Sequence, residues 1–139
     1  ATGQEGAVMG SGMAMESNDW IFPALREGGV ALLRGFDFSQ YIAQLFGNGV
    51  DRSLGRQMPC HYSDASIHFV SLSSPIGTQI PQAVGAAWGA KIQRNKDVVI
   101  GYMGDGATSE GDFHVSLNMA ALHDLPVVFF CQNHLLLGI

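Results

Sequence analysis

The stretch that decides the fold of this chain is VVIGYMGDG at residues 98–106, which is followed by VVFFCQN at residues 127–133. Each stretch begins with a short apolar run that predicts a β-strand. The residues between them are enough for a helix of about four turns. The pattern therefore predicts a right-handed, parallel βαβ unit over residues 97–133, and with it an α/β fold.

The turn after the first run predicts a site for a metal-bound diphosphate. Open α/β sheets bind ligands at the carboxyl ends of their strands, and Asp105 offers a hard oxygen there to Mg²⁺. Gly104 and Gly106 let the backbone turn sharply and approach the phosphates. Ser109 is expected to cap the next helix, with the acidic Asp112 three residues on, so that free N–H groups face the anion. This layout points to thiamine diphosphate with Mg²⁺, and the alternative is an ordinary turn with a solvated aspartate.

Composition narrows the class of protein. Of the 139 residues, 47% are hydrophobic and only 14% are charged, against a usual charged share of about 25%. Such poor polar cover suggests a single domain whose surfaces pack against other protein. The net charge of −5, without a basic cluster, gives no support to nucleic-acid binding, and no apolar run approaches the ~20 residues of a membrane span. Cys60 and Cys131 are expected to be buried, reduced thiols of an intracellular or organelle-matrix protein without a visible signal peptide.

The rest of the chain gives weaker signals. We expect helices over residues 4–15, 38–46 and 78–94, an irregular segment over 19–27, a long loop over 47–64 and a short strand over 68–72. Residues 30–33 are ambiguous between strand and helix. The helix over 38–46 should bury Tyr41, Ile42, Leu45 and Phe46, and the helix that Thr78 caps should pack closely through Ala83, Ala86, Ala87 and Ala90.

Three runs carry a resemblance to a known family. They are GRQMPCHY at 55–62, SSPIGTQIPQAVGAA at 73–87 and GDGATSEGDFH at 104–114. Together they resemble the alpha subunit of branched-chain 2-oxo acid (2-oxoisovalerate) dehydrogenase, the thiamine diphosphate-dependent decarboxylating component. The resemblance runs up to Asn133 and implies a parallel sheet flanked by helices in the thiamine diphosphate-binding fold. Because that subunit is considerably longer, residues 1–139 should form one partial domain that is incomplete at both ends.

The resemblance implies the cofactor-binding residues. Arg26 would grip the diphosphate through its guanidinium, and Leu25 precedes it where relatives often carry tyrosine. Backbone groups of Ser74 and Ile76 would hold the aminopyrimidine ring. Gly104, Gly106 and Ala107 would contact the diphosphate, and Gln132 stands where relatives often use Arg or Glu. No catalytic residue is assigned, because the glutamate that starts the chemistry belongs to the beta subunit in this family.

The resemblance also implies two metal sites. Asp105 would bind Mg²⁺, and oxygens of Ser73, Pro75, Thr78 and Gln79 would coordinate K⁺. The second Mg²⁺ ligand of the family, an asparagine, falls here on His134, and the third, a backbone carbonyl, falls on Leu136. Imidazole suits Mg²⁺ less well than an amide oxygen, and Asn133 could take its place. The departure favours residues 134–139 as a tail foreign to the family, through truncation or a reading-frame error, and the alternative is a genuine histidine ligand.

The implied function is oxidative decarboxylation of branched-chain 2-oxo acids, with acyl transfer to lipoyl groups, in branched-chain amino acid catabolism. The chain would hold the Mg²⁺-diphosphate half of the site and be inactive alone. Its partners would be a beta subunit, in an alpha2-beta2 heterotetramer, and a lipoyl-bearing acyltransferase core, in the bacterial cytoplasm or the mitochondrial matrix. The alternatives are the alpha subunit of a pyruvate or acetoin dehydrogenase, and a non-catalytic chain that has lost cofactor binding.

Overall fold

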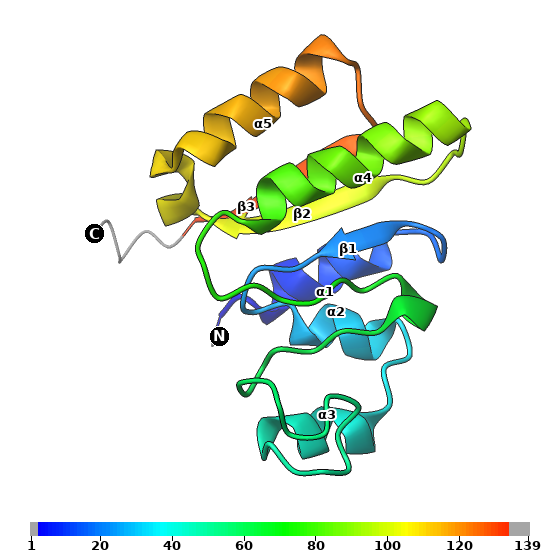
Figure 1. Ribbon diagram of the computed structural model, residues 1–139, viewed down its shortest axis with the longest axis vertical. Coiled ribbons are helices and arrows are strands. Elements are labelled where there is room, and N and C mark those ends of the chain that lie inside the picture. The colour runs from blue at the N-terminus through cyan, green and yellow to red at the C-terminus, as the bar shows by residue number, and fades with distance from the viewer. Residues whose placement is uncertain (1–2, 134–139) are drawn as a thin grey trace.

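The computed structural model describes residues 3–133 and contains a parallel three-stranded sheet with the order β1-β2-β3. The strands are β1 (Trp20–Phe22), β2 (Val99–Gly104) and β3 (Val127–Gln132). Both pairings are parallel, so that Gly101 lies opposite Phe22 on one side and Phe129 on the other. The α/β fold and the parallel unit over residues 97–133 are therefore confirmed (Figure 1).

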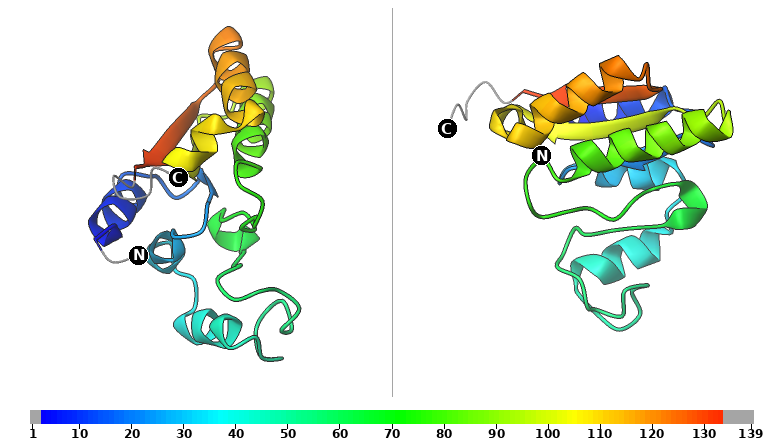
Figure 2. Two further views of the ribbon diagram at one scale, coloured as in Figure 1. Left: turned by 90° about the vertical axis from the view of Figure 1, so that its left-hand side faces the viewer. Right: turned by 45° about the horizontal axis from the view of Figure 1, so that its top comes forward.

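Helices cover both faces of the sheet. Helices α4 (Gln79–Gln93) and α5 (Gly111–Leu122) lie against one face, while α1 (Glu5–Met13) and α2 (Gly28–Leu33) lie on the other (Figures 1 and 2). Helix α3 (Phe38–Leu45) and the loop after it lie farther from the sheet. Two short 3₁₀ turns, η1 (Ala65–Ile67) and η2 (Asp105–Ser109), complete the order of elements.

The side chains of β2 alternate between the two layers. Val99 packs with Ala83 and Ala87 of α4, whereas Ile100 and Tyr102 pack into the cluster that includes residues of α1 and α2. All five residues from Val99 to Met103 are buried, because helices cover both faces of this central strand. This explains why the strand is a continuous apolar run.

Helix α4 approaches β2 closely through small residues, as predicted. Ala83 and Ala87 are fully buried, and a Cβ atom added to Gly101 would lie 3.2 Å from the Cβ of Ala83. The side chain of Gln79 fixes the same contact, since its Nε2 donates to the Tyr102 carbonyl oxygen at 2.7 Å. The first turn of α4 is therefore tied to the end of β2.

The expectation that residues 19–27 are irregular was wrong at Trp20–Phe22, which form β1. A strand of three residues is too short to show a period, so the sequence pattern could not reveal it. Tertiary contacts define it instead: the Trp20 N–H donates to the Val98 carbonyl at 3.0 Å, and the Val98 N–H donates to Asp19 Oδ1 at 2.8 Å.

The structure decides one expectation that was left open and corrects others. Residues 30–33 are helical, and residues 68–72 form only isolated bridges of Phe69 with Ile21 and Asp64. In α3 the predicted apolar face is right for Tyr41 and Leu45, which are partly buried against the core. It is wrong for Ile42 and Phe46, which are exposed, whereas Ala43 and Gln44 are buried. The Gln44 side chain is buried because it donates to the Met58 carbonyl and accepts the Cys60 N–H, which pins the long loop to the helix.

Both cysteines are free thiols, as predicted, but only Cys60 is partly buried, and Cys131 is exposed. Among the described residues, no helix is both long enough and apolar enough to cross a membrane.

The close approach of α4 and β2 gives a prediction for stability. Gly101→Val should lower the free energy of unfolding by about 1–3 kcal/mol, because its methyl groups would overpack the contact with Ala83. Gly85→Ala, on the exposed side of α4 where an added Cβ meets nothing within 4 Å, should instead raise it by about 0.5–1 kcal/mol. Urea denaturation of both variants measures the difference, and equal effects would contradict the packing argument.

Candidate cofactor site

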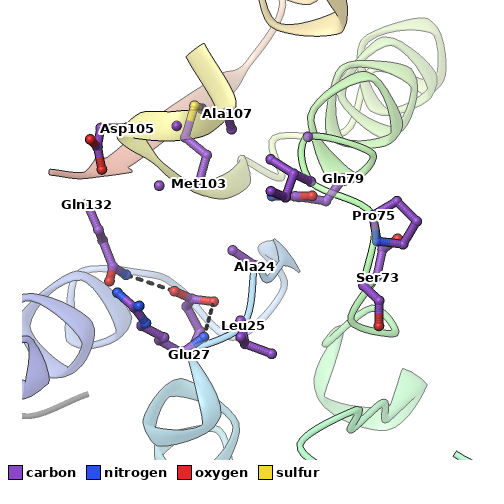
Figure 3. Close-up of a pocket in the computed structure, with 16 residues that line it drawn as sticks. Ala24, Leu25, Glu27, Ser73, Pro75, Gln79, Met103, Asp105, Ala107 and Gln132 are labelled. Atoms are coloured by element: carbon purple, nitrogen blue, oxygen red, sulfur yellow. Dashed lines mark hydrogen bonds between the residues drawn. The ribbon is translucent and has the colours of Figure 1, made fainter. Parts of the chain in front are cut away.

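The carboxyl ends of the three strands open onto a pocket of about 360 Å³. Four segments line it: residues 24–27 after β1, residues 73–77 before α4 together with Gln79, residues 103–107 at the end of β2, and Gln132 at the end of β3. Figure 3 shows side chains from all four segments facing the same space. The pocket therefore lies where an open α/β sheet binds its ligands.

The structure brings nearly all the predicted site residues together. Every predicted cofactor-binding residue lines the pocket: Leu25, Arg26, Ser74, Ile76, Gly104, Gly106, Ala107 and Gln132. Of the predicted metal ligands, Asp105, Ser73, Pro75 and Gln79 line it as well. Thr78 and the exposed Asn133 do not, while His134 and Leu136 lie outside the described residues.

The turn that carries Asp105 is a 3₁₀ turn over Asp105–Ser109, which stands between β2 and α5. Its Thr108 hydroxyl donates to the Asp105 carbonyl at 2.6 Å, and the buried Ala107 packs against Ile80 and Met103. The prediction that Ser109 caps α5 was wrong, because Glu110 holds that position and makes no side-chain cap. The inserted turn moves the start of α5 beyond residues 103–107, which line the pocket.

The loop that carries Ser73 to Gly77 is held by a hydrogen bond to the side chain of His61. His61 is buried, and its Nδ1 lies 3.0 Å from the Pro59 carbonyl oxygen, which can only accept. The other ring nitrogen, Nε2, therefore accepts from the Ser74 hydroxyl in the neutral ring. Thr78 occupies the N-cap position of α4, but its side chain makes no capping hydrogen bond, contrary to our expectation.

A buried carboxyl group that we did not predict lies in the same pocket. Glu27 is 1% exposed, and its Oε1 accepts from Gln132 Nε2 at 2.8 Å (Figure 3). Its Oε2 accepts the Arg26 backbone N–H at 3.1 Å. Burial raises the pKa of the Glu27 carboxyl, against hydrogen bonds from backbone groups and Gln132 that act to lower it. The sequence offered no signal for this group, because β1 was not recognised and Gln132 is 105 positions away.

Arg26, the neighbour of Glu27, adds a cationic side chain to the lining of the pocket. Its Nη1 donates to Gln4 Oε1 at 3.1 Å, which connects the turn after β1 to the residue that precedes α1. The guanidinium also lines a smaller cavity of about 180 Å³ beside α1. Its side chain is exposed, so it has room to reach a ligand in either space.

The residues present fit a diphosphate bound with a divalent cation. The pocket is lined by a guanidinium and by the backbone of small residues, which can hold an anion, and by a carboxylate, which can bind the cation. Within residues 3–133 there is no group of three or more His, Cys, Asp or Glu side chains that could hold a metal. A cation here would therefore draw its other ligands from the anion, from amide or carbonyl oxygens and from water, as Mg²⁺ usually does.

The fold and pocket define an open-sheet α/β protein with a pocket at the carboxyl ends of its parallel strands. The chain belongs to the dehydrogenase E1 component family, whose pattern matches residues 1–135. The predicted resemblance is thereby confirmed, and membership of this family implies thiamine diphosphate as the cofactor.

Individual relatives agree with this assignment. The chain is 48% identical over 132 residues to the mitochondrial 2-oxoisovalerate dehydrogenase subunit alpha of Homo sapiens, and 45% identical over 134 residues to subunit alpha 2 of Arabidopsis thaliana. These alignments cover 95% and 96% of this chain but only 30% and 28% of the relatives. The chain thus spans less than a third of the length of the curated relatives it matches.

A solved structure shows the same fold. It is that of a protein from Mycobacterium smegmatis assigned to the thiamin diphosphate-dependent enzymes, with a TM-score of 0.57 and 17% identity. The match covers 94% of this chain and 20% of that chain. At this identity the likeness supports the fold alone.

The buried Glu27 gives a prediction for the pH dependence of stability. Because its pKa in the folded state is raised above the ordinary value of 4.5, the folded protein binds more protons than the unfolded chain as the pH rises from that value. The wild type should therefore lose stability relative to Glu27→Gln as the pH rises above about 4.5. The slope should be at most about 1.4 kcal/mol per pH unit.

Urea unfolding of both proteins over a pH series measures this slope. Asp37→Asn provides a contrast of opposite sign, because the Ser39 hydroxyl lowers the pKa of Asp37 and the wild type should lose stability relative to that variant as the pH falls below 3.8. A slope of zero for Glu27→Gln would contradict the raised pKa.

Proposed function

We propose that the chain is the diphosphate-binding part of a thiamine diphosphate-dependent 2-oxo acid dehydrogenase, of the type that oxidatively decarboxylates branched-chain 2-oxo acids and passes the acyl group to lipoyl groups. The observation that carries the proposal is the pocket, which gathers every cofactor-binding residue expected from the family resemblance. The two relatives compared above are both named 2-oxoisovalerate dehydrogenase alpha subunits, and these names support the branched-chain substrate class.

In this proposal each residue has a binding or positioning role. Arg26 and Gln132 hold the diphosphate together with backbone N–H groups of Gly106 and Ala107. Gly104 lets the backbone come close to the phosphates. Leu25 lies beside them, and backbone groups of Ser74 and Ile76 orient the aminopyrimidine ring. When bound, thiamine diphosphate supplies the electron sink for decarboxylation.

The metal roles are part of the same proposal. Asp105 binds Mg²⁺ through its carboxylate, with Asn133 as a further oxygen ligand. His134 and the backbone carbonyl of Leu136 stand at the positions of the family's other Mg²⁺ ligands. Oxygens of Ser73, Pro75, Thr78 and Gln79 coordinate K⁺. The hydrogen bond from Gln79 Nε2 to the Tyr102 carbonyl oxygen agrees with this role, because it leaves the amide oxygen of Gln79 as the ligand atom.

The proposed assembly follows because this chain would hold only the Mg²⁺-diphosphate half of the active site. The groups in this pocket bind and orient an anion, and a beta subunit would supply the catalytic glutamate from across an interface. We propose an alpha2-beta2 assembly that works with a lipoyl-bearing acyltransferase core, in the mitochondrial matrix or in the bacterial cytoplasm. The relatives carry mitochondrial names, which favours the first location for a eukaryotic source.

Two alternatives have distinct outcomes. With the partner subunit present, a preference for pyruvate or acetoin over branched-chain 2-oxo acids would assign the chain to a related dehydrogenase. Failure to bind thiamine diphosphate with Mg²⁺ would identify a chain that keeps the fold without the cofactor.

Asp105→Ala should abolish Mg²⁺-dependent binding of thiamine diphosphate, because it removes the carboxylate at the end of the central strand. Calorimetric titration in the presence of the partner subunit measures this. Asp112→Ala is the matched control, since Asp112 is an exposed carboxylate in the first turn of α5 that does not line the pocket. Unchanged affinity in Asp105→Ala would place the metal elsewhere.

Arg26→Ala should weaken binding of the diphosphate by about 2–4 kcal/mol, the cost of removing one partner of a charge pair that the ligand buries. Thiamine, which lacks the phosphates, should bind both proteins alike. Arg56→Ala serves as the control, because Arg56 is exposed and does not line the pocket. Equal weakening of thiamine and its diphosphate would show that Arg26 does not bind phosphate.

A further inference from the structure

Glu27 is an unusual group to find beside a site for an anion. It is buried, it lines the pocket, and it carries a carboxyl group at the carboxyl end of β1. A negative charge close to a diphosphate repels it, and burial of a carboxylate is itself costly. Electrostatic attraction therefore cannot explain its presence in the pocket, whereas its two hydrogen bonds can.

The hydrogen bonds of Glu27 join the two segments that carry Arg26 and Gln132, which are the side chains proposed to bind the diphosphate. One carboxyl oxygen holds the Arg26 backbone N–H at 3.1 Å, and the other holds Gln132 Nε2 at 2.8 Å (Figure 3). The first bond fixes the turn after β1, and the second fixes a side chain at the end of β3, on the far side of β2. A single carboxyl group therefore sets the distance between Arg26 and Gln132.

The carboxylate also fixes which end of the Gln132 amide faces it. A carboxylate only accepts hydrogen bonds, so Gln132 must present its NH₂ group to Glu27. An amide at position 27 would offer one acceptor in place of two. The Arg26 N–H and the Gln132 NH₂ would then compete for it, and both segments could bond only if the Gln132 amide turned round.

We propose that Glu27 is a positioning residue for diphosphate binding, which holds Arg26 and the amide of Gln132 in the arrangement that receives the phosphates. The inference deepens the proposed function and rests on it. In this role Glu27 acts through its two acceptor oxygens and the length of its side chain. Its negative charge disfavours diphosphate binding, and the hydrogen bonds offset this cost.

Two variants separate this role from the others that a buried glutamate can have. Glu27→Gln removes the charge and one acceptor, whereas Glu27→Asp keeps the charge and both acceptors on a shorter side chain that cannot reach both partners. If Glu27 positions Arg26 and Gln132, both variants should weaken binding of thiamine diphosphate with Mg²⁺ about tenfold. This loss corresponds to about 1.4 kcal/mol of binding free energy. The affinity for thiamine, which lacks the phosphates, should change by no more than about twofold.

The matched control is Asp19→Asn at the opposite end of β1. Asp19 is also buried, and its two carboxyl oxygens also hold two N–H donors, those of Glu16 and Val98, both at 2.8 Å. It lines neither cavity described above. Asp19→Asn should lower the melting temperature of the ligand-free protein without changing the ratio of diphosphate to thiamine affinity.

The experiment is calorimetric titration of each protein, assembled with its partner subunit, with thiamine diphosphate and Mg²⁺ and then with thiamine. Tighter diphosphate binding by Glu27→Gln, with Glu27→Asp unchanged, would show that only the charge matters and would overturn the inference. Parallel losses for both ligands, as a merely structural role predicts, would also overturn it. If Glu27→Gln does not fold, the result for Glu27→Asp decides by the same ratio.

The result for the unaltered protein separates the two levels of the proposal. If the unaltered protein fails to bind thiamine diphosphate with Mg²⁺, the proposed function is wrong and this inference falls with it. If the unaltered protein binds and both Glu27 variants bind equally well, the inference alone is wrong. A selective loss of diphosphate affinity in both variants supports it.

Discussion

The burial of β2 on both faces, with parallel partners along both edges, is the constraint on which the rest of the structure depends. Alternate side chains of this strand fill two separate layers, one formed by α4 and the other by α1 and α2. Because both partners run parallel to β2, the carboxyl ends of all three strands meet at one edge of the sheet. A polar side chain at Val99 or Ile100 would be buried, and it would destabilise the fold unless it found a hydrogen-bond partner.

The pocket is a consequence of that shared edge. The turns that leave β1 and β2 and the last residue of β3 are brought to the same place, and α4 carries the loop of Ser73 to Gly77 to the fourth side. Close packing of Ala83 against Gly101 and the bond of Gln79 to Tyr102 hold α4 at its position. The pocket is therefore tied to the core, and in the proposed function this would help to orient the diphosphate.

Polar groups in the pocket are few and mutually supported. His61 supports Ser74 from the long loop, Gln4 holds the guanidinium of Arg26, and Glu27 joins Arg26 to Gln132. The bonds of Gln4 to Arg26 and of Glu27 to Gln132 connect segments that are 22 and 105 residues apart in sequence. In the proposed function this arrangement binds a diphosphate by preorganised donors, and the cost of burying Glu27 is offset by the N–H groups that it accepts.

The sequence by itself determined the βαβ unit and the turn of Asp105, because strand period, apolar runs and glycine chemistry are local properties that a linear pattern records. The family resemblance added the residues of the loop before α4 and the turn after β1, and nearly all of them meet in the pocket. Tertiary structure alone decided the rest. Trp20–Phe22 become a strand only by pairing with β2, Ser109 belongs to a 3₁₀ turn that no cap signal predicts, and Gln44 is buried because the distant loop needs its amide. Glu27 and Gln132 are 105 residues apart, so their bond exists only where the ends of β1 and β3 flank the same strand.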